Sequence, residues 1–333
     1  MSSAVPSRRE LFGVAAALGF GTTTFHRAVA AEVESLQPAG AVTVTPEMIE
    51  KAEWVAGVTL TDEQRKQAAS ALSRTVREAA TLHKVEIGNH VAPAMHFVPN
   101  PGQAPSTEGR GKVSLAAHDV KKPEKGEDLA FLPLSQLAEL VRTKQVSSTE
   151  LTKLYLERLK QYDPALLCVV TLTEELSLKQ AAEADKEIAA GKYRGPLHGV
   201  PWGAKDLIAY PGFKTTWGAG HYKEQTLEGK ATVASRLEDA GAVLAAKTTL
   251  GAIAMGDQWF GGMTRNPWNV KTGSSGSSAG SASSVSAGLV GFAIGSETLG
   301  SIVSPCKACG ASGLRPTFGR VSRHGCRSLA WSR

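Results

Sequence analysis

The residues best suited to covalent chemistry are serines, which cluster between positions 273 and 281 in the segment GSSGSSAGS. On composition alone this segment could be a flexible linker. A serine attacks a carbonyl group only when a base takes its proton, so a base has to be found elsewhere. The sequence has no G-x-S-x-G motif and no convincing Ser-His-Asp order, and His198 is a weak candidate on its own.

Lysine is the recognised alternative base, and Lys205 lies in the apolar, glycine-rich segment GVPWGAKD. A base must be neutral before it accepts a proton. Lowering a lysine pKa from about 10.4 to about 7 disfavours the cation by roughly 4 to 5 kcal/mol, which burial can supply. The alternative is an ordinary lysine that pairs with a carboxylate, and Asp206 is its neighbour in the sequence.

Two further segments change the weight of these alternatives. GSETLGSIVSP spans positions 295–305, and GLRPTFGRVS spans positions 313–322. Together with the serine-rich segment, GVPWGAKD and the AMG at 254–256, they make the sequence resemble the amidase signature family over roughly residues 128–325. Because several separate motifs agree in order and spacing, the resemblance is specific.

The resemblance implies a catalytic set of two serines and a lysine. Matched motif by motif, the nucleophile is Ser301, the bridging serine on an unusual cis peptide bond is Ser277, and the base is Lys205. Ser274 also opens a serine pair after a glycine, but the spacing of 24 residues from Ser277 to Ser301 suits the family. The implied chemistry is amide hydrolysis through a proton relay and an acyl-enzyme.

By the same resemblance, backbone N–H groups of the turn before and at the nucleophile form the oxyanion hole. They belong to Thr298, Leu299, Gly300 and Ser301. No cofactor and no metal ion is implied, and the partner is a small-molecule amide substrate. The sequence does not indicate an oligomeric state.

Helical and strand-like segments alternate through the second half of the chain, which predicts an α/β domain. The resemblance makes this an α/β/α sandwich with a mixed sheet. Helical periodicity over residues 45–83 predicts a small helical N-terminal region, and scattered Pro and Gly over 97–125 predict an extended linker. The expected domains are a signal peptide at 1–30, a helical appendage at 31–96, a linker at 97–127 and the amidase signature domain at 128–333.

The first thirty residues resemble a twin-arginine export signal, because SRRELF at 7–12 precedes an uncharged run and an A-x-A site at 28–30. The uncharged run is too short for a stable membrane anchor. We therefore expect a periplasmic or exported bacterial protein.

The net charge is +6, but the basic residues are scattered among 31 acidic residues, which argues against a nucleic-acid partner. Four cysteines in 333 residues fit neither a disulfide framework nor a zinc finger, so we expect structural roles for them.

The chain also departs from the family pattern. Val303 stands where members often carry Arg, and Leu299 replaces a common Gly. Members usually continue for well over a hundred residues past the G-R-V-S tail, whereas this sequence ends at Arg333, so we expect a C-terminally truncated domain with an open sheet edge. Two alternatives to an exported amidase stay open: a non-catalytic remnant, and the glutaminase subunit of a tRNA-dependent amidotransferase.

Overall fold

The structure is a computed structural model that describes residues 43–56, 58–82, 84 and 119–327. The chain divides into two compact units, residues 1–88 and 89–333. The predicted signal peptide and most of the predicted linker lie outside the described residues. Within the described part, no helix combines the length and the apolar character that a membrane span requires.

The described part of the first unit contains two helices, in the region where the periodicity predicted helical structure. α3 spans Pro46–Ala56 and α4 spans Asp62–Leu82. The turn before α4 is closed by reciprocal bonds, because the Thr61 amide donates to Gln64 Oε1 at 2.8 Å and the Gln64 amide donates to Thr61 Oγ1 at 3.3 Å. The Arg65 guanidinium joins the helices by donating to Glu53 at 2.7 Å.

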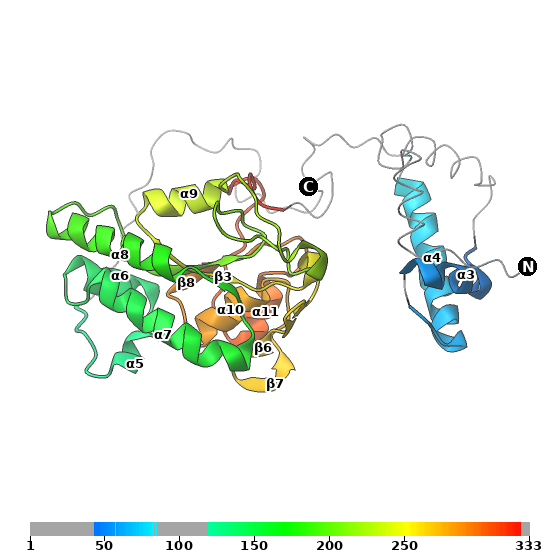
Figure 1. The fold of residues 1–333 in the computed structure, drawn as a ribbon, viewed down its shortest axis with the longest axis horizontal. Helices are drawn as coiled ribbons and strands as arrows, with labels where there is room; N and C mark the ends of the chain where they lie inside the picture. The colour runs from blue at the N-terminus through cyan, green and yellow to red at the C-terminus, as the bar shows by residue number, and fades with distance from the viewer. Residues whose placement is uncertain (1–42, 57, 83, 85–118, 328–333) are drawn as a thin grey trace, which may run out of the picture. The chain divides into compact units, whose positions relative to one another are not determined.

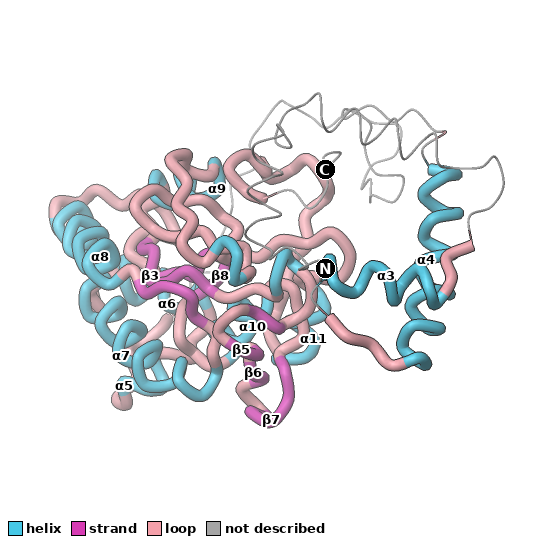
Figure 2. The backbone as a smooth tube through the Cα atoms, turned by 45° about the vertical axis from the view of Figure 1, so that its right-hand side comes forward, coloured by secondary structure: helices cyan, strands magenta, loops and turns pink. Residues whose placement is uncertain are grey.

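The second unit is built on a four-stranded sheet (Figures 1 and 2). Its order is β1 (Val169–Leu172), β3 (Val243–Thr248), β2 (Pro201–Lys205) and β8 (Phe292–Ile294). β2 runs parallel to β3 and β8, whereas β1 runs antiparallel to β3, so the sheet is mixed. All residues of β2 and β3 are buried, as expected for central strands covered on both faces.

Helices cover both faces of this sheet, which confirms the expected α/β sandwich. One face packs against α9 (Thr232–Asp239) and the start of α8 (Glu174–Ala189), around Trp202 and Leu244. The other face packs against α7 (Ser148–Leu166) and the region of α10 (Ala279–Ser286), around Ala245 and Val290. In Figure 1, α9 lies above the strands and α10 below them.

The remaining elements are short. α5 (Gly126–Leu129) and α6 (Leu134–Arg142) extend the core beside α7, and α11 (Val303–Cys309) packs against α10. Two small hairpins pair β4 (Gln258–Trp259) with β5 (Gly262–Met263) and β6 (Arg265–Asn266) with β7 (Asn269–Gly273). Single helical turns span Gly220–Tyr222 and Ala252–Ala254.

The local sequence explains where α7 begins. Ser147 is the N-cap of α7, and its hydroxyl accepts the Glu150 amide at 2.9 Å, as the S-x-x-E pattern predicts. Of the residues of β1 only Val169 is buried, because β1 is an edge strand of the sheet among the described residues.

Candidate active site

The predicted site residues come together at the carboxyl ends of two neighbouring strands of the sheet. β2 and β8 are parallel neighbours, so their carboxyl ends lie side by side, at the edge where open α/β sheets bind ligands. Lys205 is the last residue of β2, and the segment that contains Ser301 follows β8. The serine-rich segment reaches the same edge because its end leads directly into α10, which packs below β2 and β8.

The side chain of Lys205 is fully buried and is held by serine oxygens. Its Nζ donates to Ser277 Oγ at 2.8 Å and to Ser278 Oγ at 3.0 Å. It also contacts Ser296 twice, through Oγ at 3.0 Å and the carbonyl oxygen at 3.2 Å. All four acceptors are neutral, so none of them compensates a positive charge at Nζ.

Burial lowers the pKa of Lys205 to about 7, and the nearby Glu297 carboxylate opposes this only in part. A lysine with this pKa is half neutral near physiological pH, and its neutral form is a base. The structure therefore has the electrostatic environment that a lysine base requires.

Asp206 is not the partner of Lys205, although the two are adjacent in the sequence. Successive side chains of a strand point to opposite faces, and Asp206 turns toward the α9 face. There its Oδ1 pairs with Lys247 Nζ at 2.7 Å, and both side chains are fully buried. The alternative in which Lys205 is an ordinary paired lysine thus describes Lys247 instead.

Ser277 lies where the resemblance places the bridging serine. It is 2% exposed, and a cis peptide bond joins it to Gly276. The chain folds so tightly here that a Cβ at position 276 would overlap the carbonyl oxygen of Gly256, so only glycine fits at this position. Ser274 and Ser275 have other partners: the Ser274 hydroxyl donates to the Ser275 carbonyl at 2.9 Å, and the Ser275 hydroxyl lies 2.8 Å from that of Ser304.

Ser301 approaches this cluster through its backbone. Its carbonyl oxygen accepts the amide of Ser278 at 3.0 Å, which fixes the turn before α11 against the serine-rich segment. The side chain is partly exposed. Among the described residues, no hydrogen bond joins the Ser301 hydroxyl to Ser277. The structure therefore brings Lys205 and Ser277 into contact and places Ser301 beside the same segment.

The four backbone amides expected in the oxyanion hole fall into two groups. The amide of Gly300 contributes, with those of Ile302 and Val303, to stabilising the Glu297 carboxylate. The amides of Thr298, Leu299 and Ser301 make no hydrogen bond within the described part of the chain. Unpaired backbone donors beside a nucleophile are suited to an oxyanion.

Sequence reasoning missed three residues of this site: Ser278, Ser296 and Glu297. The two serines hold Lys205 Nζ directly, and the carboxylate organises the turn that contains Ser301. Ser296 and Glu297 lie within the GSETLGS segment, so the motif that identified the nucleophile also contained this signal.

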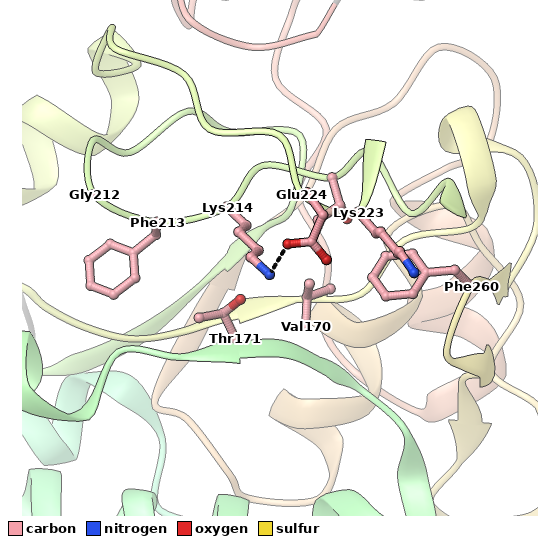
Figure 3. Close-up of a pocket in the computed structure, with 9 residues that line it drawn as sticks. Val170, Thr171, Gly212, Phe213, Lys214, Lys223, Glu224 and Phe260 are labelled. Carbon is pink, nitrogen blue, oxygen red and sulfur yellow. Dashed lines mark ion pairs between the residues drawn. The ribbon is translucent and has the colours of Figure 1, made fainter. Parts of the chain in front are cut away.

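A hollow of about 400 Å³ lies between Val170 and Thr171 of β1 and the loop over residues 212–224 (Figure 3). Phe213 and Phe260 line it, and Lys214 and Glu224 form an ion pair of 2.6 Å across it. The Lys214 carbonyl oxygen accepts Lys247 Nζ at 3.0 Å, which connects this hollow to the buried pair. Neither the predicted base nor the predicted serines line it, so it is separate from the candidate site.

The weaker sequence candidates lie elsewhere. His198 is buried beside Glu187, and its Nδ1 accepts the Arg194 amide at 3.1 Å. Cys306 and Cys309 lie on α11 as free thiols, and burial raises the pKa of both. The described residues contain no group of three or more His, Cys, Asp or Glu side chains placed to hold a metal ion.

Comparison with known proteins places the chain in a family. The model of the amidase family matches residues 150–333. The chain is 40% identical over 208 residues to the A subunit of the glutamyl-tRNA(Gln) amidotransferase of Carboxydothermus hydrogenoformans. That alignment covers 62% of this chain and 43% of the Carboxydothermus protein.

Solved structures give the same picture. The native peptide amidase from Stenotrophomonas maltophilia aligns with a TM-score of 0.55 and 40% identity, over 58% of this chain and 42% of that one. A fatty acid amide hydrolase aligns with a TM-score of 0.58 and 31% identity, over 61% of this chain and 37% of that one. The chain thus spans about two fifths of the length of these relatives. With its motifs, its mixed sheet and more than half of its length matched, the chain belongs to the amidase signature family.

Proposed function

We propose that this protein is an amide-bond hydrolase that works through an acyl-enzyme on Ser301. The observation that supports this most strongly is the contact of 2.8 Å between Lys205 Nζ and Ser277 Oγ, in surroundings that lower the pKa of Lys205 to about 7. Family membership supports amide hydrolysis in general. We further propose that the substrate is a linear amide, that the reaction uses a proton relay and that the protein is exported.

In the proposed reaction, neutral Lys205 takes the proton of the Ser277 hydroxyl while Ser277 takes the proton of Ser301. The Ser301 oxygen then bonds to the carbonyl carbon of the amide. The free amides of Thr298, Leu299 and Ser301 receive the oxyanion, and one such donor is typically worth about 2.7 to 4 kcal/mol. The proton returns through Ser277 to the nitrogen, the C–N bond breaks, and the amine leaves. Water then cleaves the acyl ester by the same relay.

The experiment is an assay of ammonia or amine release from a panel of simple linear amides by the full chain. We expect Ser301→Ala and Lys205→Ala to abolish release, whereas the matched control Ser275→Ala retains it, because Ser275 contacts Ser304 and not Lys205. Retained activity in either of the first two variants would rule out the proposed mechanism.

Two alternative functions can be distinguished from the hydrolase by experiment. The glutamyl-tRNA(Gln) amidotransferase relatives make a glutaminase subunit the second candidate. A non-catalytic remnant is the third, because the Ser301 hydroxyl makes no hydrogen bond to Ser277 in the described part of the chain. A thermal melt combined with a fluorophosphonate probe addresses the remnant: a cooperative transition with Ser301 labelled supports the hydrolase, and the absence of both supports the remnant.

We also propose export through the twin-arginine pathway, which the arginine pair at positions 8–9 supports. Export would separate the protein from tRNA and so favour the hydrolase over the glutaminase subunit. A reporter fused to residues 1–30 should reach the periplasm, and the matched control in which both arginines are replaced by lysine should not. A cytoplasmic reporter in the first fusion would contradict the proposal.

A further inference from the structure

The Glu297 carboxylate is the acidic group that acts on Lys205 from the Ser301 turn. Its side chain is 1% exposed. One carboxylate oxygen accepts the amides of Ile302 at 2.8 Å and Val303 at 3.0 Å, and the other accepts the Arg315 guanidinium at 3.1 Å. Burial alone would raise the pKa of Glu297, but the amides of Val303, Ile302 and Gly300 and the guanidinium together lower it, so the group is ionised.

These contacts divide the backbone amides of the turn into two groups. Those of Gly300, Ile302 and Val303 are directed at the carboxylate, and those of Thr298, Leu299 and Ser301 are left without a partner among the described residues. Gly300 has φ +82°, a left-handed conformation that glycine adopts without strain and that lets the chain reverse around the carboxylate. The carboxylate at position 297 therefore holds the amides on either side of Ser301 and leaves the amide of Ser301 itself without a partner among the described residues.

The segment that carries this carboxylate also contacts the base. Ser296, the residue before it, holds Lys205 Nζ through both its hydroxyl and its carbonyl oxygen. The other charged pair near the end of β2, Asp206 with Lys247, occupies the opposite face of the sheet. Within the described part of the chain, the ionisable groups that interact with Glu297 are Lys205, Arg315 and the Cys306 thiol on α11.

We propose that Glu297 is a positioning residue of the hydrolase: its carboxylate shapes the Ser301 turn and, with Arg315 as its counter-ion, sets the charge that Lys205 experiences. The relay in which Lys205 acts rests on the proposed function. The electrostatic effect of Glu297 on Lys205 does not, because it is a property of the folded chain.

The test compares Glu297→Gln, Glu297→Ala and Arg315→Gln with the unmodified full chain. The pKa of Lys205 is read from the ¹³Cε signal of labelled lysine, assigned by its loss in Lys205→Met. Glu297→Gln keeps an oxygen acceptor and removes the charge, so the Lys205 cation loses support and its pKa falls by about one pH unit. Arg315→Gln removes the counter-charge, so the pKa of Lys205 rises, by less because Arg315 is half exposed.

Labelling of Ser301 by a fluorophosphonate supplies the second readout. In Glu297→Gln the midpoint of its pH dependence moves to lower pH with the pKa of Lys205, and the rate at high pH falls less than in Glu297→Ala, because glutamine keeps an oxygen acceptor for the turn. In Glu297→Ala the turn loses its acceptor, and the rate at high pH falls by about 10²–10³-fold.

An unchanged Lys205 pKa in both Glu297→Gln and Arg315→Gln would overturn the inference, and so would a Glu297→Gln variant that labels slowly at every pH without moving its midpoint. If Ser301 of the unmodified protein is not labelled but the two pKa shifts appear with opposite signs, the proposed function fails and the electrostatic role of Glu297 stands. If Glu297→Ala does not fold, the other two variants still decide.

Discussion

Two buried lysines lie on neighbouring strands of one sheet, and they differ in the groups that contact them. Lys205 on β2 points to the α10 face and contacts serine oxygens. Lys247 on β3 points to the α9 face and contacts the Asp206 carboxylate at 2.7 Å. Both are fully buried, and burial lowers the pKa of both.

The partner of each lysine decides what burial does to it. Asp206 opposes the effect of burial on Lys247, so the charge of that side chain is compensated and the pair serves the fold. Among the described residues no carboxylate contacts Lys205, its hydrogen-bond acceptors are neutral, and the Glu297 carboxylate offsets burial only in part, so the neutral amine becomes available near pH 7. The same residue type is thus part of a buried ion pair on one face and a candidate base on the other.

The largest difference should appear when each lysine is replaced by methionine, which has a similar shape and no charge. We expect Lys205→Met to slow fluorophosphonate labelling of Ser301 by about 10²–10⁴-fold, the usual value of a general base, while the fold is retained. Lys247→Met should act on stability instead, because it leaves the Asp206 carboxylate buried without a counter-charge. Labelling rates and thermal melts of both variants measure this, and a Lys205→Met protein that labels within about tenfold of the unmodified rate would break the comparison.

The next effect concerns the carboxylate of the pair. Asp206→Asn leaves the buried Lys247 cation uncompensated, and we expect the free energy of unfolding to fall by about 3–5 kcal/mol. Denaturant unfolding measures the loss. The double variant Asp206→Leu with Lys247→Met is the control, because removing both charges should destabilise less than removing either alone. An Asp206→Asn protein as stable as the unmodified one would show that the pair does not stabilise the fold.

A smaller, graded effect is expected from pH. Below the pKa of Lys205 the amine is protonated and cannot accept a proton, so the labelling rate should fall about tenfold per pH unit below about 7 and level off above it. The labelling rate therefore rises with pH, and the midpoint of this rise gives the pKa of the base. A midpoint near the ordinary lysine value of about 10.4 would mean that burial does not tune Lys205.

Part of this comparison could be predicted from the sequence. The motifs identified Lys205 and Ser277, which the structure places in contact, and the alternation of helices and strands predicted the α/β domain around the sheet. The partner of Asp206 could not be predicted, because adjacency in the sequence suggested Lys205. Alternation of side chains along a strand sends the two to opposite faces, and the pairing of β2 with β3 then supplies Lys247.

The contributions of Ser278, Ser296 and Glu297 could not be predicted for a related reason. They depend on how the turn after β8 folds back on the start of α10, where the Ser278 amide donates to the Ser301 carbonyl oxygen at 3.0 Å. Motif matching names the residues that react, whereas the residues that hold them are set by backbone contacts between segments far apart in the sequence.

The most direct test of the central claim is a titration of both lysines in one sample, with ¹³Cε-labelled lysine and signals assigned from Lys205→Met and Lys247→Met. We predict that Lys205 loses its proton near pH 7, and that Lys247 loses its proton at a higher pH than Lys205 because the Asp206 carboxylate contacts it at 2.7 Å. A Lys205 signal that remains that of an ammonium group up to about pH 9, or two lysines that titrate together, would contradict the account.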